Sequence, residues 1–367
     1  MESESRRSPF YASAEAAGGT HMEEEGWFWL DSFGDFDGEY EAVRNSLGVW
    51  DVSPLNKWEF TGPDALEAAQ RVHANNIAGL QVGQVRYGAF CDTDGLMIDD
   101  GTIYRLEDRV WVMTNGHDRL DHFTQAASGL DASIENITLN MPHLGLQGPN
   151  ARKALDPVCG IDLSTLGYFR FHPELTTVGG VPCYVSRTGF GGELGYELFC
   201  SPEVAADLWD VVTGPIGARP YGVSIVETLR VEAGLVVLGY DYQEHEITPF
   251  DLSFDKMVAL DGGEFLGRDA LRSVADNPPN RFKTVVIDGD VLPDYGAEVT
   301  IDGRPVGTLT SPAPSPKFGL LGMAILETAV AVDGQRVEVA LEDGTVGATV
   351  APLSILDPEK RRPRAQA

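Results

Sequence analysis

The chain has 367 residues, 43% of them apolar, and a formal net charge of −29 from 56 acidic and 27 basic residues. This length predicts two or three packed units, and the apolar content excludes a largely disordered chain. The negative charge argues against a nucleic-acid binder and against binding to an anionic membrane, since both surfaces would repel the protein. No apolar run reaches the roughly 18–20 residues of a membrane-spanning helix.

The basic residues are unevenly divided between six lysines and twenty-one arginines. An acidic, lysine-poor composition resembles that of proteins from salt-loving cells, in which salt screens the repulsion between carboxylates. An ordinary acidic cytoplasmic enzyme is the alternative. The four cysteines form no C-x-x-C pair, which argues against a disulfide framework or a structural zinc site. The first residues lack the apolar segment of a secretory signal, so we expect a cytoplasmic protein.

The N-terminal part of the chain predicts alternating helices and strands. Residues 8–35 are irregular and aromatic, and we expect them to pack on a core. A short helix follows at 37–48, with Asp37 as its N-cap and Gly48 at its end. Two runs of alternating residues then flank an Asp-Gly turn and predict a β-hairpin over 85–91 and 96–106. Further helices are predicted at 62–80, 201–214 and 225–239.

The sequence pattern changes near residues 275–283, a stretch that contains Asn, Pro and Arg and marks a domain boundary. Short strands separated by turn residues then occupy 283–355 and predict a small antiparallel barrel. We therefore divide the chain into a first region over 1–275, a barrel domain over 280–358 and a frayed, charged tail over 359–367.

Two acidic sites stand out, because the common phosphate-loop, zinc-protease and serine-hydrolase motifs are absent. Asp99 and Asp100 are adjacent carboxylates between apolar residues, and on a strand they would face opposite ways. A pair that caps a turn is the structural alternative. Glu197 lies between Tyr196 and Leu198 on a predicted strand and is either a buried acceptor or an outward-facing charge.

Several short motifs resemble the aminomethyltransferase (glycine cleavage T-protein) family and its folate-dependent demethylase relatives. They occur in the family's order over some 350 residues. They are EAVRNSLGVWDVS, GPDA, DGLMIDD, LQGPNA, SRTGFGGELGYE, ETLRVEAG, EFLGRDAL and VGTLTSPAPSP. The resemblance implies an α+β, three-lobed clover leaf with two interleaved lobes and a C-terminal antiparallel β-barrel. It also implies tetrahydrofolate as the cofactor.

The resemblance carries roles to particular residues. The second acid of the D-D element falls on Asp100 and implies a catalytic role, and the pterin-binding Glu falls on Glu197. A carboxylate can accept the pterin's exocyclic amine and ring N–H together. Tyr87 and Phe190 match aromatic residues beside the pterin, with core packing as the alternative for both. Phe190 stands where the family usually has Tyr, so a hydroxyl is lost.

The sequence departs from the family near the one-carbon site. The family's His-Met is Pro54-Leu55 here, a ligand-binding Arg is replaced by Val226, and the Asn after the hairpin becomes Thr114, with Asn115 beside it. We expect Leu55 and Thr114 to contribute to cofactor binding. Arg187 and Arg230 are candidates for a cationic rim that binds the anionic folate tail, although each could instead pair with local acids.

The first hypothesis is a transferase that moves a methyl or methylene group from a small N-, S- or O-linked donor to tetrahydrofolate. The retained pterin acids and changed neighbours favour a demethylase-like paralogue. The alternative is the glycine cleavage aminomethyltransferase itself, which would need a lipoylated carrier protein as partner. A non-catalytic folate-binding protein is a second alternative, but the Cys of that group's signature is absent. Neither a metal nor a flavin is implied.

Overall fold

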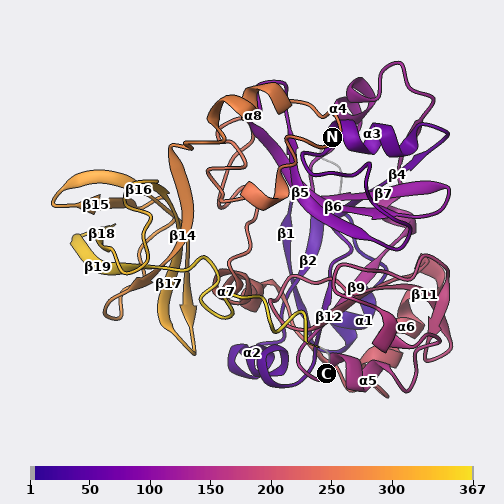
Figure 1. Ribbon diagram of the computed structural model, residues 1–367. Coiled ribbons are helices and arrows are strands. Elements are labelled where there is room, and N and C mark those ends of the chain that lie inside the picture. Colours follow the sequence, from indigo (N-terminus) through magenta and orange to yellow (C-terminus); the bar gives the residue numbers. More distant parts are fainter. Residues whose placement is uncertain (1–4, 366–367) are drawn as a thin grey trace.

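The computed structural model describes residues 5–365, which form three lobes (Figure 1). Two lobes are built on open β-sheets, and the third is a closed antiparallel barrel at the C-terminal end of the chain. The barrel lies to one side of the two sheets, and the last residues return from it to the second sheet (Figure 1). This mixed architecture with a C-terminal barrel confirms the predicted fold class.

The first lobe is a five-stranded antiparallel sheet in the order β5-β6-β7-β4-β8. Its strands are β4 (Asn56–Thr61), β5 (Val85–Cys91), β6 (Met97–Arg105), β7 (Arg109–Thr114) and β8 (Ser133–Asn136). Helices α3 (Ala65–Val72) and α4 (Leu120–Ala126) pack on one face, where Trp58, Phe60 and Phe123 are buried. The opposite face carries Tyr104 and Trp111, which pack against residues of the second lobe. The predicted β-hairpin is present as β5 and β6.

The second lobe is a six-stranded sheet in the order β10-β11-β12-β9-β3-β13. Its strands are β3 (Gly48–Asp51), β9 (His143–Gln147), β10 (Thr176–Val178), β11 (Val181–Ser186), β12 (Gly195–Phe199) and β13 (Arg219–Pro220). Strand β3 precedes the first lobe in the chain and β9 follows it, so the two lobes interleave. The helical elements outside the first lobe are α1 (Tyr11–Ala16), α2 (Phe36–Asn45), α5 (Ala151–Leu155), α6 (Ala205–Thr213), α7 (Val223–Ala233), α8 (Arg268–Val274), η1 (Thr138–Asn140), η2 (Leu163–Thr165), η3 (Pro202–Val204) and η4 (Asp255–Met257).

The N-terminal segment is more regular than its sequence indicates. It contains α1 and a β-hairpin of β1 (Thr20–Glu24) and β2 (Trp27–Ser32), and Phe10 and Trp27 are buried as expected for a packed segment. The expectation of irregular structure is therefore wrong. The N-cap expected at Asp37 is also wrong, because the Asp35 side chain accepts the hydrogen bond from the Gly38 N–H and α2 begins at Phe36.

The barrel closes in the order β14-β17-β16-β15-β18-β19, with β19 paired to β14. Its strands are β14 (Asn280–Ile287), β15 (Glu298–Ile301), β16 (Arg304–Ser315), β17 (Gly319–Glu327), β18 (Arg336–Leu341) and β19 (Gly344–Ala351). Alternate residues such as Val285, Val299, Val339 and Val350 fill its interior.

Helix α7 connects the sheets to the barrel, because it contacts β2, α2, β16 and β17. It ends at Ala233, six residues before the predicted end at 239, and its C-cap is Gly234, whose φ is 66°. A Cβ at this position would lie 2.2 Å from the Leu353 carbonyl oxygen, so both conformation and space require glycine. Glu232 near the same end is fully buried and accepts hydrogen bonds from Tyr40 of α2 and Ser315 of β16.

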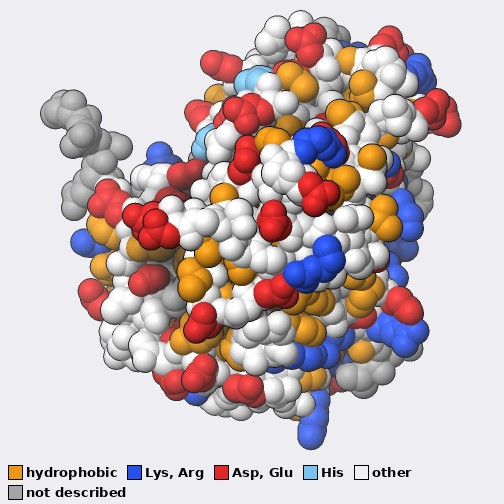
Figure 2. Space-filling model, turned by 90° about the vertical axis from the view of Figure 1, so that its left-hand side faces the viewer, with side chains coloured by type: hydrophobic (Ala, Val, Ile, Leu, Met, Phe, Trp, Pro, Cys, Tyr) orange, Lys and Arg blue, Asp and Glu red, His pale blue; other side chains and the backbone are white. Residues whose placement is uncertain are grey.

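The surface seen from the barrel side carries many acidic side chains scattered among basic and apolar ones (Figure 2). This distribution is the one expected from the net charge of −29. Across residues 5–365, no helix combines the length and the apolarity needed to span a bilayer.

Candidate functional site

Asp100 lies in the middle of β6, where its backbone pairs with Ala89 of β5 and Asn115, directly after β7, approaches it from the other side. Its carboxylate is 7% exposed and accepts hydrogen bonds from the hydroxyls of Tyr87 at 2.7 Å and Tyr242 at 2.5 Å. The Asn115 side chain adds a longer contact at 3.3 Å. Two tyrosines and an amide therefore orient a buried acid, which excludes the turn-capping alternative for Asp100.

The surroundings of Asp100 make it an unusually strong base for a carboxylate. Burial raises its pKa first, and the charge of Asp99 raises it further, while the bonds from Tyr242, Tyr87 and Asn115 partly oppose both effects. The resulting pKa is about 7. Such a group is divided between its ionised and protonated forms at neutral pH, which is the condition that favours proton transfer.

Glu197 lies on β12, in the sheet of the second lobe, and faces Tyr104 of β6. Its Oε2 accepts hydrogen bonds from the Tyr104 hydroxyl at 3.1 Å and from the Thr188 hydroxyl. Its Oε1 has no hydrogen-bond donor among residues 5–365, although the side chain is only partly exposed. Burial raises the pKa of Glu197, and bonds from Thr188 and Tyr104 oppose that rise. One oxygen is thus held in place and the other remains able to accept donors from a ligand.

Lys57 is a buried cation that sequence reasoning missed. It lies on β4, is fully buried, and donates to the backbone carbonyls of Ser53 at 2.8 Å and Leu55 at 2.9 Å. Burial lowers its pKa to about 7, although the charges of Asp51 and Glu197 oppose this. Asn56 and Trp58 flank it, and the alternation with Trp58 and Phe60 would place Lys57 on a polar face, so no local signal identifies it as buried. Lys57 fixes the loop that carries Leu55.

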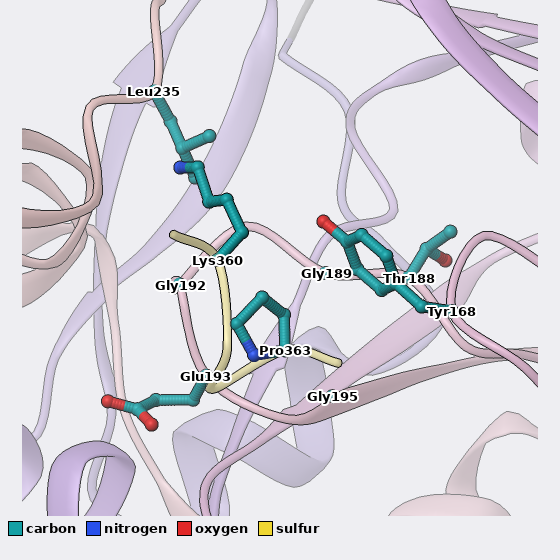
Figure 3. Close-up of a pocket in the computed structure, with 9 residues that line it drawn as sticks. All are labelled: Tyr168, Thr188, Gly189, Gly192, Glu193, Gly195, Leu235, Lys360 and Pro363. Atoms are coloured by element: carbon teal, nitrogen blue, oxygen red, sulfur yellow. The ribbon is translucent and has the colours of Figure 1, made fainter. Parts of the chain in front are cut away.

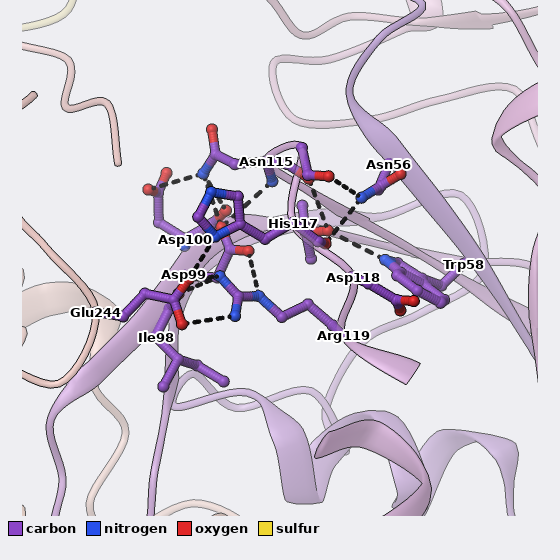
Figure 4. Close-up of polar contacts among 12 residues, drawn as sticks. Asn56, Trp58, Ile98, Asp99, Asp100, Asn115, His117, Asp118, Arg119 and Glu244 are labelled. Carbon is purple, nitrogen blue, oxygen red and sulfur yellow. Dashed lines mark hydrogen bonds and ion pairs between the residues drawn. The ribbon is translucent and has the colours of Figure 1, made fainter. Parts of the chain in front are cut away.

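Asp99 belongs to a chain of charged groups that reaches the partly exposed Glu244 (Figure 4). Its Oδ2 accepts from Arg119 Nε at 2.8 Å, and its Oδ1 accepts from the Asn115 side chain at 2.7 Å. The other guanidinium nitrogens of Arg119 bind both oxygens of Glu244, at 2.9 and 3.0 Å. Glu244 also contacts His117. Both acids of the pair are therefore used, one toward the tyrosines and one toward a cation.

A small pocket of about 30 Å³ lies beside the glycine-rich loop and is partly open to solvent. Thr188 and Gly189 line one side, and Lys360 and Pro363 of the C-terminal segment cross the loop on the other (Figure 3). Thr188 also bonds Glu197, so this pocket adjoins the second carboxylate.

The described part of the C-terminal segment is bound to the second lobe, which differs from the expected frayed tail over 359–367. Arg362 forms an ion pair with Glu193 at 2.9 Å, and Lys360 donates to the Ala233 carbonyl at 2.7 Å. Residues 366–367 lie outside the described residues.

Comparison with protein families settles the relationship that the motifs indicate. A family model of the GCVT N-terminal domain matches residues 10–262, and a model of the glycine cleavage T-protein C-terminal barrel domain matches residues 280–357. The chain belongs to the glycine cleavage T-protein family. It is therefore a member of a family of enzymes, and the resemblance seen in the sequence is confirmed.

Relatives within the T-protein family carry more than one name. A probable aminomethyltransferase of Halobacterium salinarum is 34% identical over 365 residues, which cover 96% of this chain and 99% of that protein. An aminomethyltransferase of Streptomyces coelicolor is 35% identical over 344 residues, covering 90% and 92%. A trimethylamine-oxide aldolase of Ruegeria pomeroyi is 35% identical over 359 residues, covering 92% of this chain and 45% of that protein.

The fold is shared with a solved T-protein. The crystal structure of glycine cleavage system aminomethyltransferase T from Bartonella henselae superposes with a TM-score of 0.87 at 24% sequence identity. The match covers 96% of this chain and 98% of the other.

Some of the residues that the T-protein resemblance predicts for the site lie away from Asp100 and Glu197. Tyr87 contacts Asp100 directly, and Leu55 lies in the loop held by Lys57. Phe190 is half-buried against the core of the second lobe. Thr114 is buried, accepts from the Trp58 ring N–H at 3.1 Å, and makes no hydrogen bond to either carboxylate. The neighbouring Asn115 bonds Asp99 and Asp100, and the cofactor-binding role expected for Thr114 stays a prediction.

The two arginines nominated for a cationic rim are both buried and internally bonded. Arg187 donates to the backbone carbonyls of Leu166 at 2.9 Å and Ala365 at 2.6 Å. Arg230 pairs with Asp241 and Glu227, each at 2.7 Å. The alternative of local pairing is therefore correct for Arg230, and Arg187 is engaged by the C-terminal segment rather than exposed on a rim.

Proposed function

We propose that this protein is a tetrahydrofolate-dependent one-carbon transferase. It moves a methyl or methylene group from a small N-, S- or O-linked donor to the folate, in the manner of a demethylase-like T-protein paralogue. The observation that carries the proposal is the pair of carboxylates: Asp100 is buried and held by two tyrosines, and Glu197 is partly buried, with Tyr104 and Thr188 bonded to one of its oxygens.

The residues present fit a reduced folate. A pterin offers adjacent N–H donors on its exocyclic amine and ring, and the Glu197 Oε1 has no donor among the described residues to satisfy it. Thr188 and Tyr104 fix the orientation of Glu197 so that this oxygen is presented to a ligand. Tyr87 and Phe190 are the aromatic residues that we assign to the pterin faces. When bound, tetrahydrofolate supplies the nitrogen that accepts the one-carbon group.

Asp100 performs the acid–base work in this proposal. In its ionised form it stabilises the positive charge that develops while a one-carbon unit is transferred, and it accepts the proton released on transfer. Tyr87 and Tyr242 each donate a hydrogen bond to one of its two oxygens and so fix its orientation. Lys57 holds the loop that carries Pro54 and Leu55 in place of the family's His-Met. In this proposal, that loop faces a donor different from the one used by the glycine cleavage enzyme.

The glycine cleavage aminomethyltransferase itself is the alternative. It is supported by the near-complete coverage of the probable aminomethyltransferase of Halobacterium salinarum. Against it stand Val226, which is buried in the core of the second lobe where the family has a ligand-binding Arg, and the similarity to a trimethylamine-oxide aldolase.

A donor panel separates the two functions. The protein is incubated with tetrahydrofolate and either an aminomethylated lipoyl carrier, dimethylglycine, trimethylamine oxide, a methylated sulfonium compound or a methoxylated aromatic compound. Methyl- and methylene-tetrahydrofolate are quantified by mass spectrometry. Product from a small donor supports the demethylase-like function, product from the lipoyl carrier alone supports the alternative, and no product from any donor contradicts both.

A further inference from the structure

Two carboxylates stand next to each other in the interior of the first lobe. Asp99 is fully buried and Asp100 is 7% exposed, and both bind the Asn115 side chain. The Asp99 Oδ1 also accepts the backbone N–H of Asp100 at 2.9 Å. Adjacent buried acids repel when both are ionised, so one of them binds a proton unless a cation compensates the pair.

Arg119 is the compensating cation. Among residues 5–365 it is the one cation in hydrogen-bond contact with either carboxylate, through its Nε and the Asp99 Oδ2 at 2.8 Å. It is 6% exposed, and its Nη2 also donates to the Ile98 carbonyl at 2.6 Å. These bonds hold the guanidinium against the strand that carries both acids (Figure 4).

We propose that Arg119 is a positioning residue for Asp100: by binding the charge of Asp99 in an ion pair, it allows Asp100 to remain ionised beside it. Arg119 has no contact with Asp100 and acts through Asp99. The inference rests on the proposed function, because the ionised form of Asp100 matters for catalysis only if Asp100 is the reacting acid.

Glu244 and His117, the outer members of the chain of charged groups, keep Arg119 in place. Glu244 binds two guanidinium nitrogens, and bonds from Arg119 and His117 outweigh its burial and lower its pKa to about 2. His117 bridges Glu244 to Glu25 at the turn of the β1–β2 hairpin. Arg119 is therefore fixed between the carboxylates of Asp99 and Glu244, and the hairpin of the N-terminal segment supports the arrangement.

The other groups around Asp100 do not replace this function. Tyr87 from β5 and Tyr242 from the loop after α7 donate hydrogen bonds but carry no positive charge. Asp241, whose charge acts on Tyr87, is paired with Arg230. The balance of charge at Asp100 thus depends on Asp99 and Arg119.

The test measures the titration of Asp100 in the protein without folate or donor. Aspartate labelled with ¹³C at the side-chain carboxyl is followed by NMR from pH 4 to 10 in molar KCl, and Asp99→Asn and Asp100→Asn assign the signals. In Arg119→Met we expect the pKa of Asp100 to rise by at least one unit, a tenfold gain in proton affinity. Arg119→Lys, which keeps the charge, is expected to shift it by less than half a unit. Arg71→Met is the matched control, because Arg71 pairs with Glu67 on the surface of the same lobe.

A charge-balanced double variant tests whether Arg119 affects the ionisation of Asp100 through its ion pair with Asp99. In Asp99→Asn/Arg119→Met, both members of the ion pair are neutral, and we expect the pKa of Asp100 to fall back to the wild-type value or below it, because the Asp99 charge that raises it is absent. This variant also serves if the single Arg119→Met protein does not fold. An unchanged pKa in folded Arg119→Met, or a pKa still raised in the double variant, overturns the proposal.

The outcome is separable from that of the proposed function. The NMR shift requires no ligand, so it can be observed even if the donor panel yields no product. Where turnover is found, the acid limb of the kcat–pH profile should move by the same amount in Arg119→Met, with tetrahydrofolate affinity at pH 9 unchanged. An acid limb that stays in place while the NMR pKa shifts would show that Asp100 is not the reacting acid.

Discussion

Replacing Asp100 by Asn should stabilise the protein while abolishing its activity. The pKa of this carboxyl is raised from 3.8 to about 7, so the folded chain binds the proton more tightly than the unfolded chain does. Stability from this group is therefore present below pH 3.8 and is lost as pH rises through about 7. Asparagine keeps an oxygen for Tyr87 or Tyr242 and cannot ionise, so it avoids this loss.

The size of the effect follows from the shift. At about 1.4 kcal/mol per pKa unit, Asp100→Asn should gain about 1–4 kcal/mol at pH 8 and close to nothing at pH 4. Turnover should fall by roughly 10²–10⁴-fold, the range of a lost general acid–base group, with a much smaller change in tetrahydrofolate affinity.

Urea unfolding at pH 4 and pH 8 in molar KCl measures the stability change. Asp94→Asn is the matched control, since Asp94 is exposed at the turn of the same hairpin and should have no pH-dependent effect. A stability change that is equal at both pH values would refute the reasoning about burial and charge. Near-normal turnover at saturating folate would refute the role given to Asp100.

Three further predictions concern the ligand, the fold and the solvent. Glu197→Gln should weaken tetrahydrofolate binding by about 10–100-fold in calorimetry, because one charge-assisted acceptor is lost, whereas Glu203→Gln, at the exit of the same strand, should leave affinity unchanged. Gly234→Ala should lower the free energy of unfolding by about 1–3 kcal/mol in urea titrations, because its φ is 66° and the Leu353 carbonyl occupies the Cβ position; an unchanged midpoint would show that the α7 end adjusts freely. The thermal midpoint should rise from low to molar KCl as surface repulsion is screened, and a flat or falling midpoint would exclude salt adaptation.

Local signals predicted the elements that depend on neighbouring residues. The Asp94-Gly95 turn determines the hairpin on which Asp100 lies, and the spacing of turns determines the barrel. The β1–β2 hairpin was missed because its turn uses Glu25 and Gly26, with φ of 50° and 75°, and Glu-Gly is a weak turn signal.

Partnerships between distant residues could not be predicted. Arg187 binds a carbonyl 178 positions away, and Arg119 binds Glu244, 125 positions away. The choice between Thr114 and Asn115 depended on where β7 ends, and a shift of one residue on a strand reverses the face that a side chain occupies. The acids themselves were identifiable because carboxylates in apolar runs are costly unless they are used.

Calorimetric titration of the wild-type protein with tetrahydrofolate, at low and molar salt, tests the central claim most directly. The account predicts saturable binding with one site per chain, strengthened by salt and lost or greatly weakened in Glu197→Gln. Absence of binding to the folded protein at every salt concentration would contradict the account and return both buried acids to a structural role.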